Sequence, residues 1–118
     1  MEPKEPGKAE YQRAAAVLRA RHEEAVHRAR ADAEAIAHLL VRDFGAKRVW
    51  LFGSLAGLRA FRRNSDIDLA VEGLDPQELF RAIGRAIQMS DFSVDIKPME
   101  ELSQESQDRV RTEGEILR

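Results

Sequence analysis

The segment VWLFGSLAGLRAFRRNSDIDLAVE, residues 49–72, decides the fold of this chain. It begins with four apolar residues, Val49 to Phe52, a pattern typical of a strand buried on both faces. Gly53 and Ser54 end this strand, because glycine permits a sharp turn and serine is a favoured first residue of a helix. A strand that leads through such a turn into a helix N-terminus exposes backbone N–H groups that can hold phosphate. The same pattern also occurs as an ordinary turn.

The end of this segment predicts a second strand that carries two carboxylates. Because side chains alternate along a strand, Asp66 and Asp68 share one face, about 6.6 Å apart, while Ile67 and Leu69 share the other. Carboxylates at this spacing can share Mg²⁺, which prefers hard oxygen ligands and is commonly bound by one or two carboxylates together with substrate phosphates. Two such ions, about 4 Å apart, would hold the attacking and leaving oxygens of a phosphoryl transfer. A solvated polar strand face is the alternative interpretation.

Gly53-Ser54, followed after eleven residues by Asp66-Ile67-Asp68, resembles the signature of the DNA polymerase β-like nucleotidyltransferases, and in particular of the minimal nucleotidyltransferases (MNT). The resemblance covers residues 41–117. That family carries a third acidic residue on a later strand, and Asp95 in the segment SVDIK, residues 93–97, matches it. In one respect the chain departs from many members: it reads Ala56-Gly57-Leu58 where they carry Ala-Arg-Gly, so the arginine of that motif is not carried over.

The resemblance implies a magnesium-dependent nucleotidyltransferase that uses a nucleoside triphosphate, usually ATP in this family. Gly53, Ser54 and Ser65 are the nucleotide-binding residues that it predicts. Asp66, Asp68 and Asp95 are the predicted catalytic and metal-binding residues, holding two Mg²⁺ ions. Asp95 would also activate the acceptor hydroxyl, as a general base or by lowering the pKa of that hydroxyl.

The resemblance also indicates which kind of molecule accepts the transferred nucleotide. A family member this small lacks a domain for nucleic-acid or antibiotic acceptors, which favours a hydroxyl on a protein. The resemblance suggests the antitoxin of a HEPN–MNT toxin–antitoxin pair, in which the transferase adds AMP to a tyrosine of its partner toxin. Two other functions stay open: an antitoxin or assembly module that acts by binding a partner through its first helix, and an antibiotic-modifying transferase completed by a second subunit.

The composition is that of a soluble globular protein. The chain has 118 residues, 43% of them hydrophobic and 34% charged, and no cysteine. No apolar run approaches the roughly 20 residues that span a bilayer, and we expect a cytoplasmic protein. The net charge of −2 argues against sequence-independent nucleic-acid binding. Residues 46–65 contain five basic and no acidic side chains, which suits either a polyphosphate site or a solvated loop.

Residues 9–44 contain neither proline nor glycine and predict one long helix that Gly45 ends. We expect residues 1–8 to be disordered, residues 9–45 to form this helix and residues 46–118 to form a nucleotidyltransferase-like domain. A helix of about 50 Å would overhang a body about 30 Å across. Its narrow apolar stripe, with Tyr11 and Leu18 at the overhanging end, favours a homodimer or a partner protein. A kink that folds the helix back is the alternative.

The remaining elements complete the predicted fold. Asp75-Pro76-Gln77-Glu78 starts a helix that runs to about Met89, the Asp95 strand follows, and a last helix spans about residues 102–113. Residues 115–117 dock back as a short tail. The apolar residues expected on the core face of the first of these helices are Leu79, Phe80, Ile83, Ile87 and Met89. The fold class is α/β (α+β), with a small mixed sheet packed by helices on one face.

Overall fold

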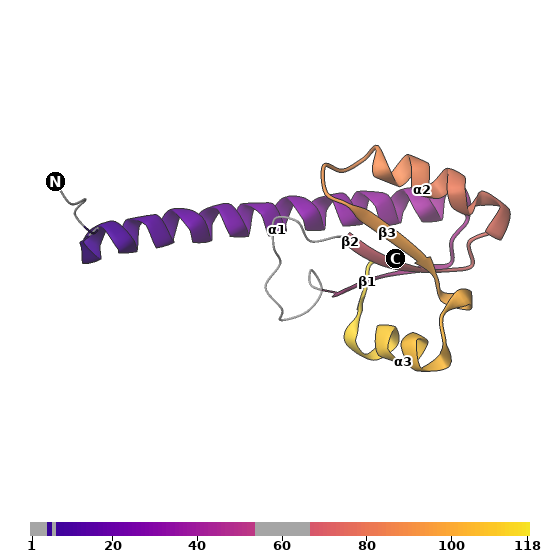
Figure 1. Cartoon of the computed structure of the whole chain (residues 1–118). Helices are drawn as coiled ribbons and strands as arrows, with labels where there is room; N and C mark the ends of the chain where they lie inside the picture. Colours follow the sequence, from indigo (N-terminus) through magenta and orange to yellow (C-terminus); the bar gives the residue numbers. More distant parts are fainter. Residues whose placement is uncertain (1–4, 6, 54–66) are drawn as a thin grey trace.

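The fold of the chain is seen in a computed structural model, which describes residue 5, residues 7–53 and residues 67–118. Its long helix, mixed sheet and shorter helices confirm the predicted fold class (Figure 1). In chain order the elements are α1 (Lys8–Phe44), β1 (Arg48–Phe52), β2 (Ile67–Glu72), the 3₁₀ turn η2 (Pro76–Glu78), α2 (Leu79–Ile87), β3 (Val94–Pro98), the 3₁₀ turn η3 (Met99–Glu101), α3 (Gln104–Glu113) and β4 (Glu115–Ile116).

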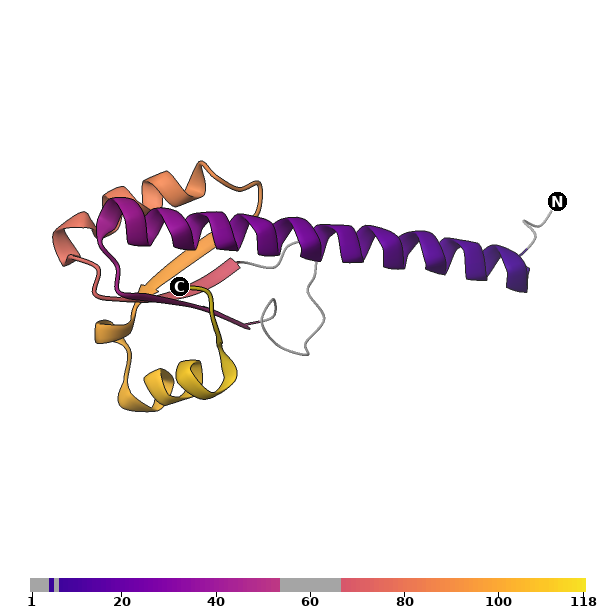
Figure 2. The ribbon, with the colours of Figure 1, turned by 180° about the vertical axis from the view of Figure 1, so that it is seen from behind.

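Helix α1 is continuous over 37 residues and overhangs the rest of the molecule (Figures 1 and 2). Gly45 ends it, with φ of 71° and an N–H that donates to the carbonyls of Leu40 and Val41. The first residues of the helix that pack against the core are Ala25 and Val26, which are partly buried, so about 25 Å of helix, residues 8–24, lies beyond the core. The long axis of the molecule measures 64 Å against 30 and 22 Å for the others. The alternative of a helix folded back on itself is therefore wrong.

Four strands form one mixed sheet in the order β3-β2-β1-β4. Strand β1 pairs antiparallel with both β2 and β4, whereas β2 and β3 are parallel. The tail predicted after the last helix is the edge strand β4, with Ile116 opposite Trp50. The Arg30 guanidinium holds this edge to α1, because it donates to both carboxylate oxygens of Glu115 at 2.7 Å.

Helices cover both faces of the sheet, so the expectation of helices on one face is wrong (Figure 2). Helices α1 and α2 pack on the face that carries Leu51 and Leu69, which are fully buried. The opposite face carries Trp50 and Ala70, and Val110 of α3 packs there together with Met99. The run of four apolar residues along β1 indicates a strand buried on both faces, which the structure confirms. A single buried valine on α3 and the neighbouring η3 are sufficient to cover the second face.

Helix α2 presents a different face to the core from the one expected. Phe80 is 85% exposed and Ile87 is 54% exposed, and Met89 is exposed as well, whereas Ala82 and Ala86 are fully buried. Of the expected core residues only Leu79 and Ile83 pack against the core, partly buried. Small residues in the contact permit close approach of helices, and α1 contributes fully buried alanines to the same cluster.

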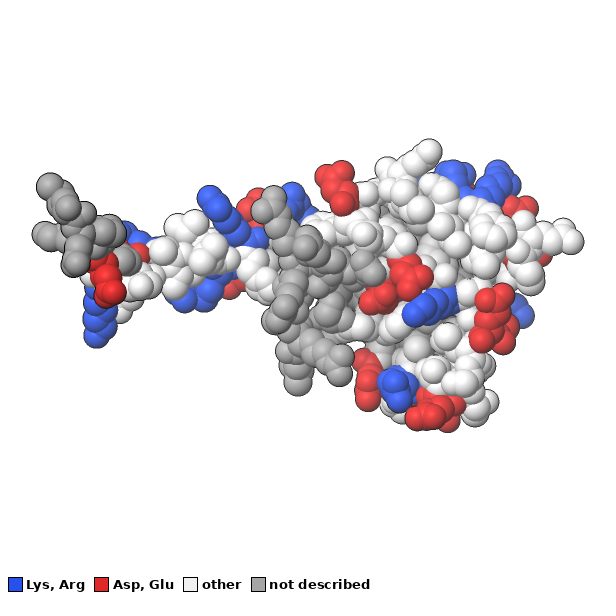
Figure 3. All heavy atoms as spheres, in the orientation of Figure 1, with Lys and Arg blue, Asp and Glu red and all other residues white. Residues whose placement is uncertain are grey.

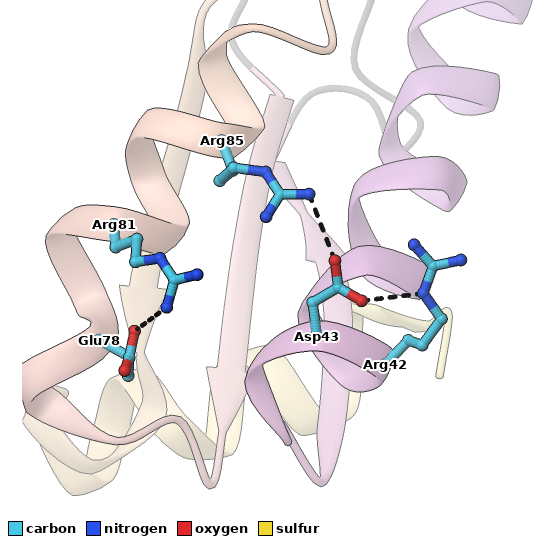
Figure 4. Close-up of polar contacts among 5 residues, drawn as sticks. All are labelled: Arg42, Asp43, Glu78, Arg81 and Arg85. Atoms are coloured by element: carbon cyan, nitrogen blue, oxygen red, sulfur yellow. Dashed lines mark hydrogen bonds and ion pairs between the residues drawn. The ribbon is translucent and has the colours of Figure 1, made fainter.

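Charged side chains join α2 to the end of α1 (Figure 4). The Asp43 carboxylate accepts from Arg42 Nε at 2.9 Å and from Arg85 Nη2 at 3.2 Å. The hydrogen bond from Arg42, with a smaller contribution from Arg85, lowers the pKa of Asp43. Arg81 and Arg85 also lie over the Phe44 ring, at 5.5 and 6.0 Å from its centroid. Within the described ranges, no helix carries an apolar stretch long enough to cross a bilayer.

Candidate active site

The predicted carboxylate strands meet at one edge of the sheet. Strand β1 ends at Phe52, and β2 and β3 begin beside that end, because β1 runs opposite to both. The first parallel contact is the hydrogen bond from the Ile67 N–H to the Ser93 carbonyl, at 2.7 Å. Asp68 is therefore opposite Phe52 on one side and Asp95 on the other.

Asp68 and Asp95 occupy paired positions of β2 and β3. Paired residues of adjacent strands send their side chains to the same face of a sheet, with strands about 4.8 Å apart. Both side chains are half-buried, and their neighbours Ile67, Leu69 and Ile96 lie in the core on the other face. The predicted parity of both aspartates is thus confirmed, and the fold brings them side by side.

Gly53 lies directly against Asp68. Its φ of 76° belongs to the left-handed region, which glycine adopts readily. A Cβ at this position would lie 3.2 Å from the Asp68 Cγ and would overlap its Oδ2 oxygen. The absence of a side chain at residue 53 therefore leaves room for the Asp68 carboxylate, in addition to permitting the turn.

Lys97 is a residue of this site that the sequence analysis missed. Its Nζ lies 3.4 Å from Asp95 Oδ2 and 5.8 Å from the centroid of the Phe52 ring. The signal was present in the sequence, because Lys97 follows Asp95 by two positions and must share its face of the strand. A cation on that face balances part of the negative charge that the paired aspartates bring together.

The other predicted site residues, Ser54, Ser65 and Asp66, lie outside the described residues. Asp66 directly precedes the described start of β2 at Ile67. Within the described ranges, no three acidic, histidine or cysteine side chains come together as a metal-binding group. The three histidines are exposed on α1.

Two carboxylates on one sheet face are a donor set that fits Mg²⁺, because this ion takes hard oxygen ligands and is usually held by one or two carboxylates, water and substrate phosphates. Asp68 and Asp95 would hold it, together with Asp66 if β2 continues its alternation by one more pair. Lys97 is the cation that already lies beside this pair.

The surface around the candidate site is of mixed charge. Figure 3 shows acidic and basic side chains interspersed over the described part of one face of the body. A shallow cavity of about 330 Å³ lies at the opposite end of the sheet, lined by Lys47, Leu74, Pro76, Pro98 and Glu100 among others. It contains neither Asp68 nor Asp95, so it is not part of the carboxylate site.

Comparison with known proteins gives a consistent result. No protein-family model and no curated protein sequence matches the chain. Among solved structures, a minimal nucleotidyltransferase matches it with a TM-score of 0.64 and 29% identity, over 75% of this chain and 92% of that one. A toxin–antitoxin complex with AMP-PNP matches with a TM-score of 0.61 and 29% identity, over 72% of each chain.

A variant of the MntA–HepT toxin–antitoxin complex also matches, with a TM-score of 0.61 and 27% identity over 72% of each chain, and it carries two aspartate-to-glutamate substitutions two positions apart. Both the fold and the sequence are therefore similar to those proteins. These likenesses agree with the sequence motif and with the paired aspartates: in fold and in sequence the chain is similar to minimal nucleotidyltransferases.

Proposed function

We propose that this protein is a magnesium-dependent nucleotidyltransferase that transfers AMP from ATP to a hydroxyl of a partner toxin, and so acts as an antitoxin. The observation that carries the proposal is the in-register pairing of Asp68 with Asp95 on one sheet face, beside Gly53. Similarity to a toxin–antitoxin complex with AMP-PNP supports a nucleotide substrate and a toxin partner. A HEPN-type toxin is the partner that the sequence motif favours.

The predicted residues of the site would bind the metal and the phosphates. Asp66, Asp68 and Asp95 would hold Mg²⁺, which when bound would neutralise phosphate charge and lower the pKa of the acceptor hydroxyl. Gly53 and Ser54 would bind the phosphates through backbone N–H groups and the Ser54 hydroxyl, and Ser65 is the third nucleotide-binding residue that the resemblance predicts. Positioning and charge neutralisation then supply most of the catalysis, as in other phosphoryl transfers.

The reaction is a single displacement at phosphorus. The acceptor oxygen attacks the α-phosphorus of ATP while the bond from that phosphorus to the bridging oxygen of the β-phosphate breaks. Pyrophosphate leaves, and the hydroxyl proton passes to the Asp95 carboxylate or to solvent. No covalent intermediate with the protein is required.

The test is isothermal titration of ATP with Mg²⁺ into the wild type and into Asp66→Asn/Asp68→Asn, with Asp108→Asn on α3 as the control. We expect binding to the wild type and the control, and loss of binding in the double variant while thermal unfolding stays unchanged. Transfer of label from [α-³²P]ATP to a protein encoded beside this chain would then identify the acceptor. Equal ATP binding by the double variant, or none by folded wild type, would contradict the proposal.

The overhanging half of α1 supports a second proposal, that the chain binds another protein through this helix. Tyr11 and Leu18 are each 63% exposed, and residues 8–28 contain no buried residue. A second copy of the chain is the partner we favour. An antitoxin or assembly module that acts by binding alone would use the same surface.

Light scattering of Tyr11→Lys/Leu18→Lys tests this surface, with Ala16→Lys/Ala20→Lys as the control on the opposite side of the helix. We expect a dimer for the wild type and the control, and a monomer for Tyr11→Lys/Leu18→Lys. A monomeric wild type would exclude self-association through this helix.

A further inference from the structure

Lys97 and Phe52 approach each other across the strand that separates them. Lys97 leaves β3 on the same face as Asp95, and its Nζ lies 5.8 Å from the centroid of the Phe52 ring on β1. Strand β2 separates β1 from β3, so the two outer strands are roughly 9–10 Å apart. The lysine and phenylalanine side chains together therefore span β2, the strand that carries Asp68.

The neighbour of Lys97 on β2 is small. Lys97 is paired in register with Ala70, which is fully buried in the cluster that contains Trp50 and Met99. Asp68 lies one step along the same face from Ala70. Lys97 thus brings a positive charge to the end of the sheet where the two carboxylates lie.

The ion pair between Lys97 and Asp95 is one that the lysine can leave for another anion. The two side chains are 48% and 44% exposed, and a pair so accessible to water is weak. The lysine side chain has a flexible four-carbon stem, and its ammonium is a compact charge that serves well as a phosphate ligand. Phe52, over which the ammonium lies, immediately precedes Gly53 at the predicted phosphate-binding turn.

We propose that Lys97 is an exchangeable counter-ion of this site: it neutralises Asp95 in the metal-free protein, and it moves to the phosphate oxygens of the nucleotide when Asp95 binds a divalent cation. The binding of Lys97 to a nucleotide rests on the proposed function. The exchange of Lys97 for a divalent cation at Asp95 does not. Lys97 is by this reasoning a nucleotide-binding residue that also tunes the affinity of Asp68 and Asp95 for a divalent cation.

The test is a pair of calorimetric titrations on the full chain, one with MgCl₂ alone and one with ATP in excess MgCl₂. In Lys97→Met the competing cation is gone, so we expect Mg²⁺ alone to bind about threefold more tightly than to the wild type. The same variant loses a phosphate ligand, so we expect ATP with Mg²⁺ to bind about fivefold more weakly. Lys97→Arg keeps the positive charge and should shift both affinities less than Lys97→Met does.

A lysine with a purely structural role would not change the affinities for Mg²⁺ and for ATP in opposite directions. Lys47→Met is the matched control, because it removes the same charge at the other end of the sheet, and it should change neither affinity. The proposal is overturned if Lys97→Met weakens both ligands or resembles Lys47→Met. If the folded wild type binds no ATP, the proposed function fails, and the MgCl₂ titration still decides the exchange at Asp95: tighter binding supports it and unchanged binding overturns it.

Discussion

Asp68 and Asp95 occupy paired positions on two parallel strands, and Gly53 lies against the first of them. Two negative charges on neighbouring strands repel each other, and the ion pair of Lys97 with Asp95 offsets part of this repulsion. A divalent ion bound by both carboxylates would offset more of it. Each of the three residues can be tested separately.

Asp95→Asn preserves the shape of the side chain and removes its charge. We expect nucleotide transfer to fall by on the order of 100-fold or more, because on the proposed mechanism Asp95 is a metal ligand and an acceptor of the hydroxyl proton. The side chain is half-buried beside Asp68, so the melting temperature should stay the same or rise slightly. Single-turnover transfer of labelled AMP measures the first effect and differential scanning fluorimetry the second. Undiminished transfer would exclude Asp95 from the chemistry.

Gly53→Ala should impair both stability and metal binding. A residue other than glycine at φ of 76° costs about 1–2 kcal/mol, and the new Cβ would also displace the Asp68 carboxylate. We expect the free energy of unfolding in urea to fall by at least this amount and Mg²⁺ affinity to fall with it.

Gly45→Ala is the control for this variant. Gly45 has φ of 71°, and no atom lies within 4 Å of a Cβ added there. It should therefore show the conformational cost alone, about 1 kcal/mol, with Mg²⁺ affinity unchanged. Equal loss of Mg²⁺ affinity in both variants would show that Gly53 acts only through stability.

Much of this arrangement could be predicted from sequence because it depends on local rules. A stretch without proline or glycine indicated α1, and a glycine marked its end. Alternation along a strand gave the face of Asp68, opposite to that of Ile67 and Leu69, since a side chain's face depends only on parity. The same rule applied to Asp95 and would have applied to Lys97, had that residue been considered together with Asp95.

The features that were mispredicted depend on contacts between distant segments. Helix α2 is apolar on two sides, and only its contact with the alanines of α1 decides that Ala82 rather than Phe80 is buried. The placement of α3 on the second face depends on one buried residue, Val110. For neither helix does the spacing of apolar residues in the sequence distinguish the observed packing from the expected one.

The orientation of α2 gives a simple contrast between two substitutions. Phe80→Gln should change the free energy of unfolding by less than about 0.5 kcal/mol, because the ring is 85% exposed. Ala82→Leu should destabilise by about 1–3 kcal/mol, because it adds volume to a fully packed contact. Urea denaturation of the two variants measures both values. The reverse order would mean that α2 is rotated toward its large apolar residues.

Through Asp43, the contribution of the junction between α1 and α2 to stability should depend on pH. Hydrogen bonds from Arg42 and Arg85 lower the pKa of Asp43 in the folded protein. Its stabilising contribution is therefore fully present above the unfolded-state pKa, about 3.9, and is lost as the pH falls through the folded-state value. The wild type should exceed Asp43→Asn in free energy of unfolding at pH 7, and the difference should shrink below about pH 4. A difference that stays constant down to about pH 2.5 would show that Asp43 stabilises the junction by packing rather than by its charge.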